Sequence, residues 1–184
     1  ADYGCRYCAR SVALRERMAA KYKGRIRWVF KNFPVNPRSR SRVAAQAALA
    51  AHQQGEFWPY HDLLFRNQGE FGAGDFSGHA DTVGLNLKRF RASMSGEALN
   101  KVIEADLSLG RKLGVNGTPT FFINGRKHLG SISHGLLKEL IDEELTYART
   151  LVKEGLKPGE VYSKLTEEKK TTADDEAKKD EDNS

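Results

Sequence analysis

The feature that most constrains this chain is its cysteine usage. The 184 residues include only two cysteines, Cys5 and Cys8, which Arg6 and Tyr7 separate. A disulfide scaffold needs distant cysteine pairs that close large loops, so this spacing excludes one. The spacing instead suits thiol–disulfide exchange, in which one thiolate attacks a disulfide and a second thiol releases the mixed intermediate.

Hydrophobic periodicity divides the rest of the chain into a definite order of elements. A strand is expected at 25–31, a loop at 67–78, and two further strands at 120–124 and 126–129. The Asn124–Gly125 pair predicts a hairpin between the last two strands, because both turn positions need positive φ. Helices are expected at 9–22, 43–52, 56–66, near 81–83, 88–94, 96–113, 134–153 and 158–165. This order indicates an α/β fold with an all-helical insertion at about residues 38–113.

Composition suggests three regions: a main domain at 1–145, a helical extension at 146–165 and a disordered charged tail at 166–184. The tail holds 8 acidic and 4 basic residues, so the body is more basic than the net charge of +6 suggests. The basic residues are spread out, with one short cluster at 38–42 and no interleaved aromatic residues, so no nucleic-acid partner is expected. No apolar run is long enough to span a membrane, and the first residues do not have the pattern of a signal peptide.

Cys5 falls where the first helix should begin. A helix N-terminus offers unpaired N–H groups and positive dipole, which stabilise a thiolate. Arg6 adds a positive charge beside it. We therefore expect the pKa of Cys5 to lie below that of a free cysteine, toward the acidic end of a range of roughly 3.5 to 7. Cys5 is then the nucleophile, and Cys8, one turn later and less exposed, is the resolving thiol.

Three other interpretations of the cysteine pair compete with thiol–disulfide exchange. A structural disulfide between residues three apart would close a tiny loop and add little stability. A zinc half-site would need two more ligands, and no two of the five histidines have ligand spacing. The third alternative is an inert, buried pair of thiols.

Four segments, in order along the chain, resemble those of DsbA-like thiol–disulfide oxidoreductases of the thioredoxin superfamily. They are the cysteine segment Asp2–Cys8, the strand segment Trp28–Pro34, the helical segment Ala44–Phe65 and the turn-rich segment Gly114–Phe121. The resemblance runs from Ala1 to about Leu145. It implies a thioredoxin-like fold with a helical insertion.

The resemblance also implies a site and a setting. Thr118–Pro119 is expected to be a cis peptide bond facing the cysteines, where it shapes the substrate groove together with Arg6 and Tyr7; a plain trans proline is the alternative. The expected partners are protein thiols and disulfides and a redox protein that resets the cysteines. No cofactor or metal is expected, and the expected location is extracytoplasmic, in the periplasm or outside the cell.

Two departures from the family pattern stand out. The family often carries proline where this chain has Arg6, which leaves the direction of electron flow open. The family also places a central strand directly before the cysteines, whereas only four residues precede Cys5 here. That strand is therefore expected to be missing or supplied by another segment. The main alternative function is a non-catalytic peptide-binding or chaperone module on the same fold. A glutathione-using relative would not need Cys8.

Overall fold

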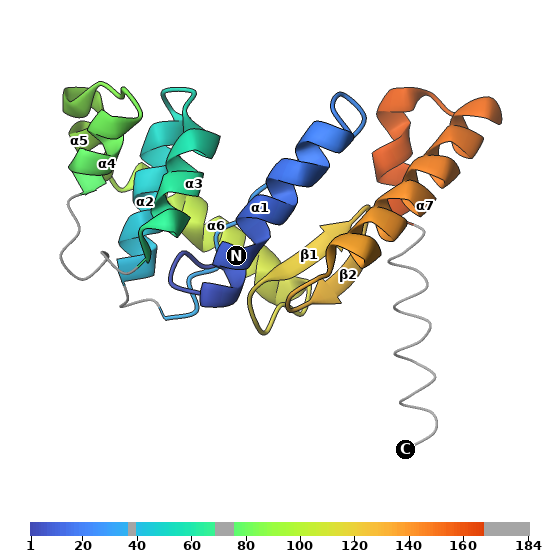
Figure 1. Cartoon of the computed structure of the whole chain (residues 1–184), viewed down its shortest axis with the longest axis horizontal. Helices are drawn as coiled ribbons and strands as arrows, with labels where there is room; N and C mark the ends of the chain where they lie inside the picture. Colours follow the sequence, from blue (N-terminus) through green and yellow to red (C-terminus); the bar gives the residue numbers. More distant parts are fainter. Residues whose placement is uncertain (37–39, 69–75, 168–184) are drawn as a thin grey trace, which may run out of the picture. The chain divides into compact units, whose positions relative to one another are not determined.

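The computed structural model describes residues 1–36, 40–68 and 76–167 (Figure 1). Its regular elements are, in order, α1 (Arg6–Lys21), α2 (Arg40–His52), α3 (Phe57–Arg66), α4 (Phe76–Thr82), α5 (Leu87–Met94), α6 (Ala98–Lys112), β1 (Thr120–Ile123), β2 (Arg126–Leu129), α7 (His134–Lys153) and a 3₁₀ turn (Pro158–Glu160). Residues 161–167 are also helical. Helices thus dominate the described part of the chain, as the predicted helical insertion requires.

The helix predictions are confirmed to within a few residues at each end. The main difference lies in the expected loop at 67–78. Its residues 69–75 lie outside the described part, but α4 begins at Phe76, so the end of that segment is helical rather than irregular. The expected tail lies outside the described residues from 168 onward.

The predicted strand at 25–31 is wrong as a strand, although its alternation is present. Ile26, Trp28 and Phe30 are partly buried, and the residues between them are exposed. The segment is extended but is not part of a β-ladder. Two parallel-type hydrogen bonds join its end to Ala1: the Ala1 amine donates to the Lys31 carbonyl at 2.9 Å, and the Phe33 N–H donates to the Ala1 carbonyl at 2.7 Å. A ladder needs a neighbouring strand with further pairs, and the described residues supply only this one contact.

The predicted hairpin is confirmed. β1 and β2 form a two-stranded sheet. Asn124 and Gly125 connect them with φ of 47° and 94°. Both residue types tolerate the left-handed region, which is why this pair specifies the turn.

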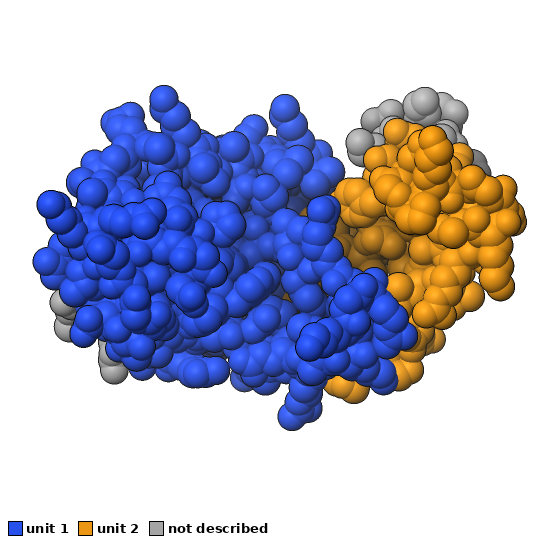
Figure 2. Space-filling view, turned by 90° about the horizontal axis from the view of Figure 1, so that it is seen from above, with its two compact units in different colours: residues 1–120, 129–131 blue, residues 121–128, 132–184 orange. Residues whose placement is uncertain are grey.

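The chain divides into two compact units (Figure 2). The first holds residues 1–120 and 129–131, and the second holds residues 121–128 and those from 132 on. Both cysteines, Thr118 and Pro119 belong to the first unit. The candidate site can therefore be described within one unit.

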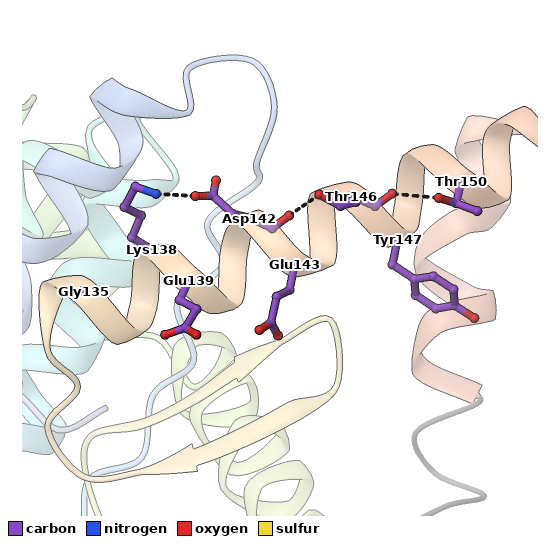
Figure 3. A pocket seen from close by; sticks show the side chains of 8 residues that line it. All are labelled: Gly135, Lys138, Glu139, Asp142, Glu143, Thr146, Tyr147 and Thr150. Carbon is purple, nitrogen blue, oxygen red and sulfur yellow. Dashed lines mark hydrogen bonds and ion pairs between the residues drawn. The ribbon is translucent and has the colours of Figure 1, made fainter.

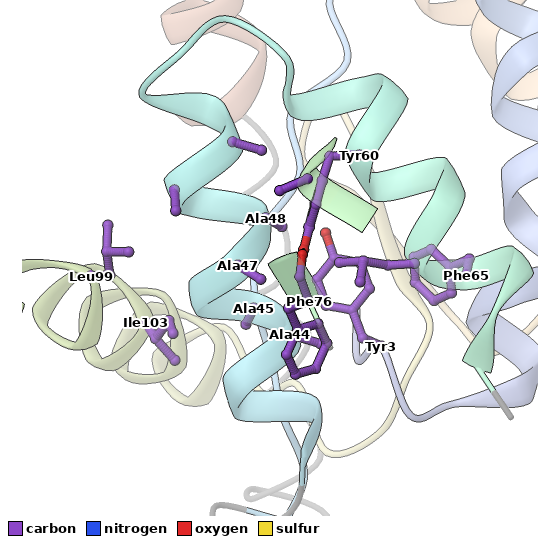
Figure 4. Close-up of a cluster of buried hydrophobic side chains, with 14 of the residues drawn as sticks. Tyr3, Ala44, Ala45, Ala47, Ala48, Tyr60, Phe65, Phe76, Leu99 and Ile103 are labelled. Carbon is purple, nitrogen blue, oxygen red and sulfur yellow. The ribbon is translucent and has the colours of Figure 1, made fainter. Parts of the chain in front are cut away.

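The core of the first unit is built around the alanine-rich helix α2, which contacts α3, α4, α5 and α6. Small side chains let neighbouring helices approach closely from several sides, because interaxial distance depends on the residues at the contact. Larger side chains, among them Tyr60 and Phe90, complete the cluster. Figure 4 shows part of it, including Tyr60. The α2 alanines that are at most 1% exposed are Ala44, Ala45, Ala47, Ala48, Ala50 and Ala51.

A buried polar group lies inside the aromatic part of this core. His61 is 4% exposed, and its Nδ1 lies 2.8 Å from Oδ1 of Asp62. Arg15 of α1 donates to the other Asp62 oxygen at 2.7 Å, and its guanidinium lies 4.5 Å from the Trp58 ring centroid. Burial lowers the pKa of His61, against the opposing effect of Asp62. This network links α1 to α3 and gives His61 a structural role.

No helix in the described part of the chain has the length and apolar character needed to cross a lipid bilayer.

Close packing between α6 and Phe33, which follows the extended segment 25–31, gives a stability prediction. A Cβ added at Gly110 would lie 2.7 Å from two ring carbons of Phe33. Gly110→Ala should therefore lower the free energy of unfolding by about 1 to 2 kcal/mol, although alanine ordinarily stabilises a helix. Chemical denaturation measures this difference.

The control is the same substitution in a Phe33→Leu background. The smaller side chain relieves the contact, so Gly110→Ala should there be neutral or stabilising. An equal cost in both backgrounds would show that the Phe33 ring is not the cause.

Candidate active site

The turn before Cys5 is held by the Asp2 carboxylate. Its Oδ1 accepts the Gly4 N–H at 2.8 Å, and its Oδ2 accepts the Val35 N–H at 2.9 Å. Asp2 is buried, and a buried carboxylate is stable only when such donors satisfy it. Asp2 thereby ties the turn to Val35, in the segment that follows residues 25–31. A side chain at Gly4 would meet the Ser41 hydroxyl at 2.4 Å, so the turn also packs closely against α2.

The Gln68 side chain, which is distant in the sequence, also holds this turn. Its amide nitrogen donates to the Tyr3 carbonyl at 2.6 Å and to the Cys5 carbonyl at 3.1 Å. The Cys5 carbonyl also accepts the Cys8 and Ala9 N–H groups at 3.0 and 3.2 Å, which begin α1. One amide therefore positions the residues on both sides of Gly4 and the first turn of the helix.

Cys5 is the N-cap residue of α1, with extended backbone (φ −87°, ψ 114°), and it is partly exposed. Burial raises the pKa of its thiol, but hydrogen bonds from the Thr118 side chain, the Cys8 backbone and thiol, and the Tyr7 backbone outweigh that effect. The pKa of Cys5 consequently lies below its ordinary value. The direction expected from the sequence is confirmed. Its cause is this set of hydrogen bonds at the helix start.

Cys8 differs from Cys5 in both exposure and pKa. It is 2% exposed and is a free thiol, as Cys5 is. Burial, together with the nearby Cys5 sulfur, raises the pKa of Cys8 to about 11. Cys5 is therefore the more acidic thiol of the pair, and Cys8 stays protonated near neutral pH.

Thr118 and Pro119 lie opposite Cys5, as the resemblance implies. The Cys5 thiol donates to the Thr118 carbonyl at 3.3 Å. The Thr118–Pro119 peptide bond is cis, and Pro119 is buried. The structure thus brings together residues that are 113 positions apart in the sequence.

Arg6 and Tyr7 are exposed at the start of α1. The Arg6 guanidinium donates to the Tyr7 hydroxyl at 3.2 Å and lies 5.1 Å from the Tyr7 ring centroid. Arg10, one turn further on, lies 5.4 Å from the same centroid. The aromatic ring thus holds two guanidinium groups beside the cysteine pair.

Sequence reasoning missed Gln68 and Arg10. Gln68 lies in the segment expected to be a loop, where neither periodicity nor a motif marks it. Arg10 falls within the helix expected at 9–22, and no motif marks it. Its position three residues after Tyr7 was the available signal, since side chains at that spacing are neighbours on a helix.

The described residues contain no arrangement of three His, Cys, Asp or Glu side chains that could hold a metal ion. A surface pocket lies along one face of α7, in the second unit (Figure 3). Within it, Lys138 pairs with Asp142 at 2.6 Å. The pocket is lined by Gly135, Lys138, Glu139, Asp142, Glu143, Thr146, Tyr147 and Thr150. None of these lining residues carries a thiol.

This fold and site define a thioredoxin-like protein with a DsbA-like helical insertion. The sequence profile of the thioredoxin family matches residues 1–143, and the chain therefore belongs to that family. A solved thioredoxin-like oxidoreductase from Silicibacter pomeroyi DSS-3 is 30% identical, with a TM-score of 0.68, over 78% of this chain and 82% of that one. The thiol–disulfide exchange protein α-DsbA2 of Wolbachia pipientis has the same fold, with a TM-score of 0.71 at 24% identity over 78% and 77% of the two chains.

Curated relatives carry a different name. An Na⁺/H⁺ antiporter, NhaA 1 of Salinispora arenicola, is 37% identical over 131 residues, which are 71% of this chain. NhaA 3 of Salinispora tropica is 34% identical over 164 residues, or 86% of this chain. The matched segment spans only 20% and 24% of the length of these two relatives.

The opposite pKa directions of the two thiols predict their reactivity. The thiolate is the species that iodoacetamide alkylates, so the rate rises with pH through the pKa of each group. In the reduced protein, Cys5 should reach half its maximal alkylation rate below the pH typical of a free cysteine, and Cys8 only near pH 11. Timed alkylation followed by peptide mass spectrometry separates the two. Faster labelling of Cys8 at neutral pH would contradict the assignment of Cys5 as the ionised thiol.

The two hydrogen bonds of Gln68 predict an effect on both stability and the site. Gln68→Leu removes both donors at similar size, and should lower the free energy of unfolding by about 1 to 2 kcal/mol. Gln68→Glu places a carboxylate against two carbonyl groups, so it should destabilise further and raise the pKa of Cys5. Denaturation and the alkylation profile of Cys5 measure the two effects. Unchanged profiles in both variants would show that the amide does not position the turn.

Proposed function

We propose that this chain catalyses thiol–disulfide exchange on protein substrates. The observation that carries the proposal is the Cys5 thiol, which is partly exposed at the start of α1, has a lowered pKa and faces Thr118. Membership of the thioredoxin family and the likeness to solved thiol–disulfide oxidoreductases support it. In this proposal a redox partner resets the cysteines and the domain lies outside the cytoplasm; the same likeness supports that location.

The reaction begins with nucleophilic attack. The Cys5 thiolate attacks one sulfur of a substrate disulfide; a Cys5–substrate disulfide forms, and the other substrate sulfur leaves as a thiolate. Cys8 then loses its proton and attacks the Cys5 sulfur. This releases the reduced substrate and leaves a Cys5–Cys8 disulfide. In the oxidising direction the same steps run in reverse, and the substrate gains the disulfide.

The raised pKa of Cys8 suits this order of events. While Cys8 is protonated it does not compete for the substrate disulfide, and the neighbouring Cys5 thiolate helps to keep it protonated. Once Cys5 is consumed in the mixed disulfide, its negative charge is gone and Cys8 ionises more easily. The backbone of Thr118, which faces the Cys5 sulfur, offers an extended substrate chain a pairing edge. In this proposal Arg6 and Tyr7 flank that chain.

Single substitutions at the two cysteines test the proposal. Cys5→Ser should reduce insulin reduction and reduced-ribonuclease oxidation to the uncatalysed rates. Cys8→Ser should instead retain attack and accumulate a Cys5–substrate disulfide, because nothing resolves it. Non-reducing gels and intact mass spectrometry detect that adduct. The reduction potential of the wild-type pair, measured against glutathione, then gives the direction of electron flow.

A non-catalytic peptide-binding module on the same fold is the competing function. It predicts that the wild type and Cys5→Ser behave alike in both assays, while both bind unfolded protein. The lowered pKa of Cys5 favours catalysis, since a more acidic thiol aids nucleophilic attack and peptide binding does not require it.

We further propose that this domain works as part of a larger protein that contains an Na⁺/H⁺ antiporter. The support is the identity to the two Salinispora antiporters, of which the chain matches about a quarter or less. Reading the coding frame outward from this domain in the source genome tests the idea. A frame that encodes only the exchange domain would contradict it.

A further inference from the structure

The exposed start of α1 carries two arginines that the fold does not use. In the described part of the chain, Arg15 pairs with Asp62 and Arg42 with Glu104, whereas neither Arg6 nor Arg10 has a carboxylate within ion-pair distance. The recorded contacts of the Arg6 and Arg10 guanidiniums are with Tyr7. We call Arg6, Tyr7 and Arg10 the arginine platform.

The platform is electrostatically unfavourable for the folded chain by itself. Arg6 and Arg10 are four residues apart on a helix, where like charges repel. Both lie in the first turns of α1, where the helix dipole favours negative charge, and the first turn contains no acidic residue. An anionic group placed on the platform would reduce both the repulsion between Arg6 and Arg10 and their unfavourable interaction with the helix dipole. The arrangement is therefore better suited to binding a partner than to stabilising the helix.

The platform also lies where a substrate of Cys5 must pass. Arg6 directly follows Cys5, and Arg10 lies about 6 Å beyond Arg6 along the helix axis, at 1.5 Å per residue. An extended chain advances about 3.3 Å per residue, so a side chain two or three positions from a substrate cysteine reaches this distance. Tyr7, which is 43% exposed, offers an aromatic face between the two charges.

We propose that the arginine platform selects protein substrates that carry Asp or Glu two or three residues from the reacting cysteine. This inference rests on the proposed exchange function and names its substrate class. The positive charge raises the local concentration of acidic segments and orients them, without changing the bonds that form and break at Cys5. Selectivity should consequently appear in the second-order rate constant and weaken with salt.

The test uses three synthetic peptides that differ only beside a single cysteine: Asp, Asn or Lys at the second and third positions from it. Each cysteine is held as a mixed disulfide with 2-thiopyridine, which is uncharged. Attack by Cys5 on the peptide sulfur forms the Cys5–peptide disulfide and releases 2-thiopyridone, whose absorbance is followed by stopped flow. The reduced full chain is used in excess.

The acidic peptide should react roughly tenfold faster than the neutral one at low salt, and the basic peptide more slowly than either. Removing both charges, in the double variant Arg6→Gln/Arg10→Gln, should bring the acidic-to-neutral ratio close to one. Arg89→Gln, which removes one exposed charge from α5, is the control and should preserve the ratio. The ratio is the chosen readout because a change in the Cys5 pKa alters all three rates together and cancels.

Equal rates for the three peptides in the wild type would overturn the substrate preference. So would an unchanged ratio in the double variant. Either result leaves the exchange function intact if the neutral peptide still reacts and Cys5→Ser does not. Failure of the neutral peptide to react with the wild type would instead reject the proposed function itself.

Discussion

Two side chains hold the turn before Cys5 by hydrogen bonds, and the geometry of the site depends on them. The Asp2 carboxylate accepts two backbone N–H groups, and the Gln68 amide donates to two backbone carbonyls. Together they satisfy polar groups on both sides of Gly4 that would otherwise be costly to leave unpaired. With the turn fixed, Cys5 caps α1 and its sulfur faces Thr118.

The chemical difference between the two cysteines follows from this geometry. Both belong to one short segment, yet hydrogen bonds at the helix start lower the pKa of Cys5, while burial one turn later raises that of Cys8. The same helix places one thiol at its exposed end and the other on its buried face, which suits the proposed roles of nucleophile and resolving thiol. Arg6 and Tyr7, between them, are exposed.

The helical insertion forms much of the core and also helps to position the site. The small side chains of α2 let its neighbours pack closely, and α3 ends next to Gln68, which reaches back to the cysteine turn. The partly buried pair of Arg15 and Asp62 joins α1 to α3. A charged hydrogen bond thus holds α1, which carries the thiols, to α3, which ends just before Gln68.

The features that depend on residues close in the sequence could be predicted without the structure. The sequence specified the cysteine spacing at the start of a helix, the helix periods, and the Asn124–Gly125 hairpin, because local backbone preference and side-chain period set each of them. It did not reveal that 25–31 lacks a ladder, since strand formation needs a partner that periodicity does not identify. The family resemblance implied that Thr118 faces Cys5, but neither periodicity nor local preference predicts that contact or the one between Gln68 and Cys5. Those contacts join positions 113 and 63 residues apart, and only chain folding brings such distant groups within hydrogen-bond range.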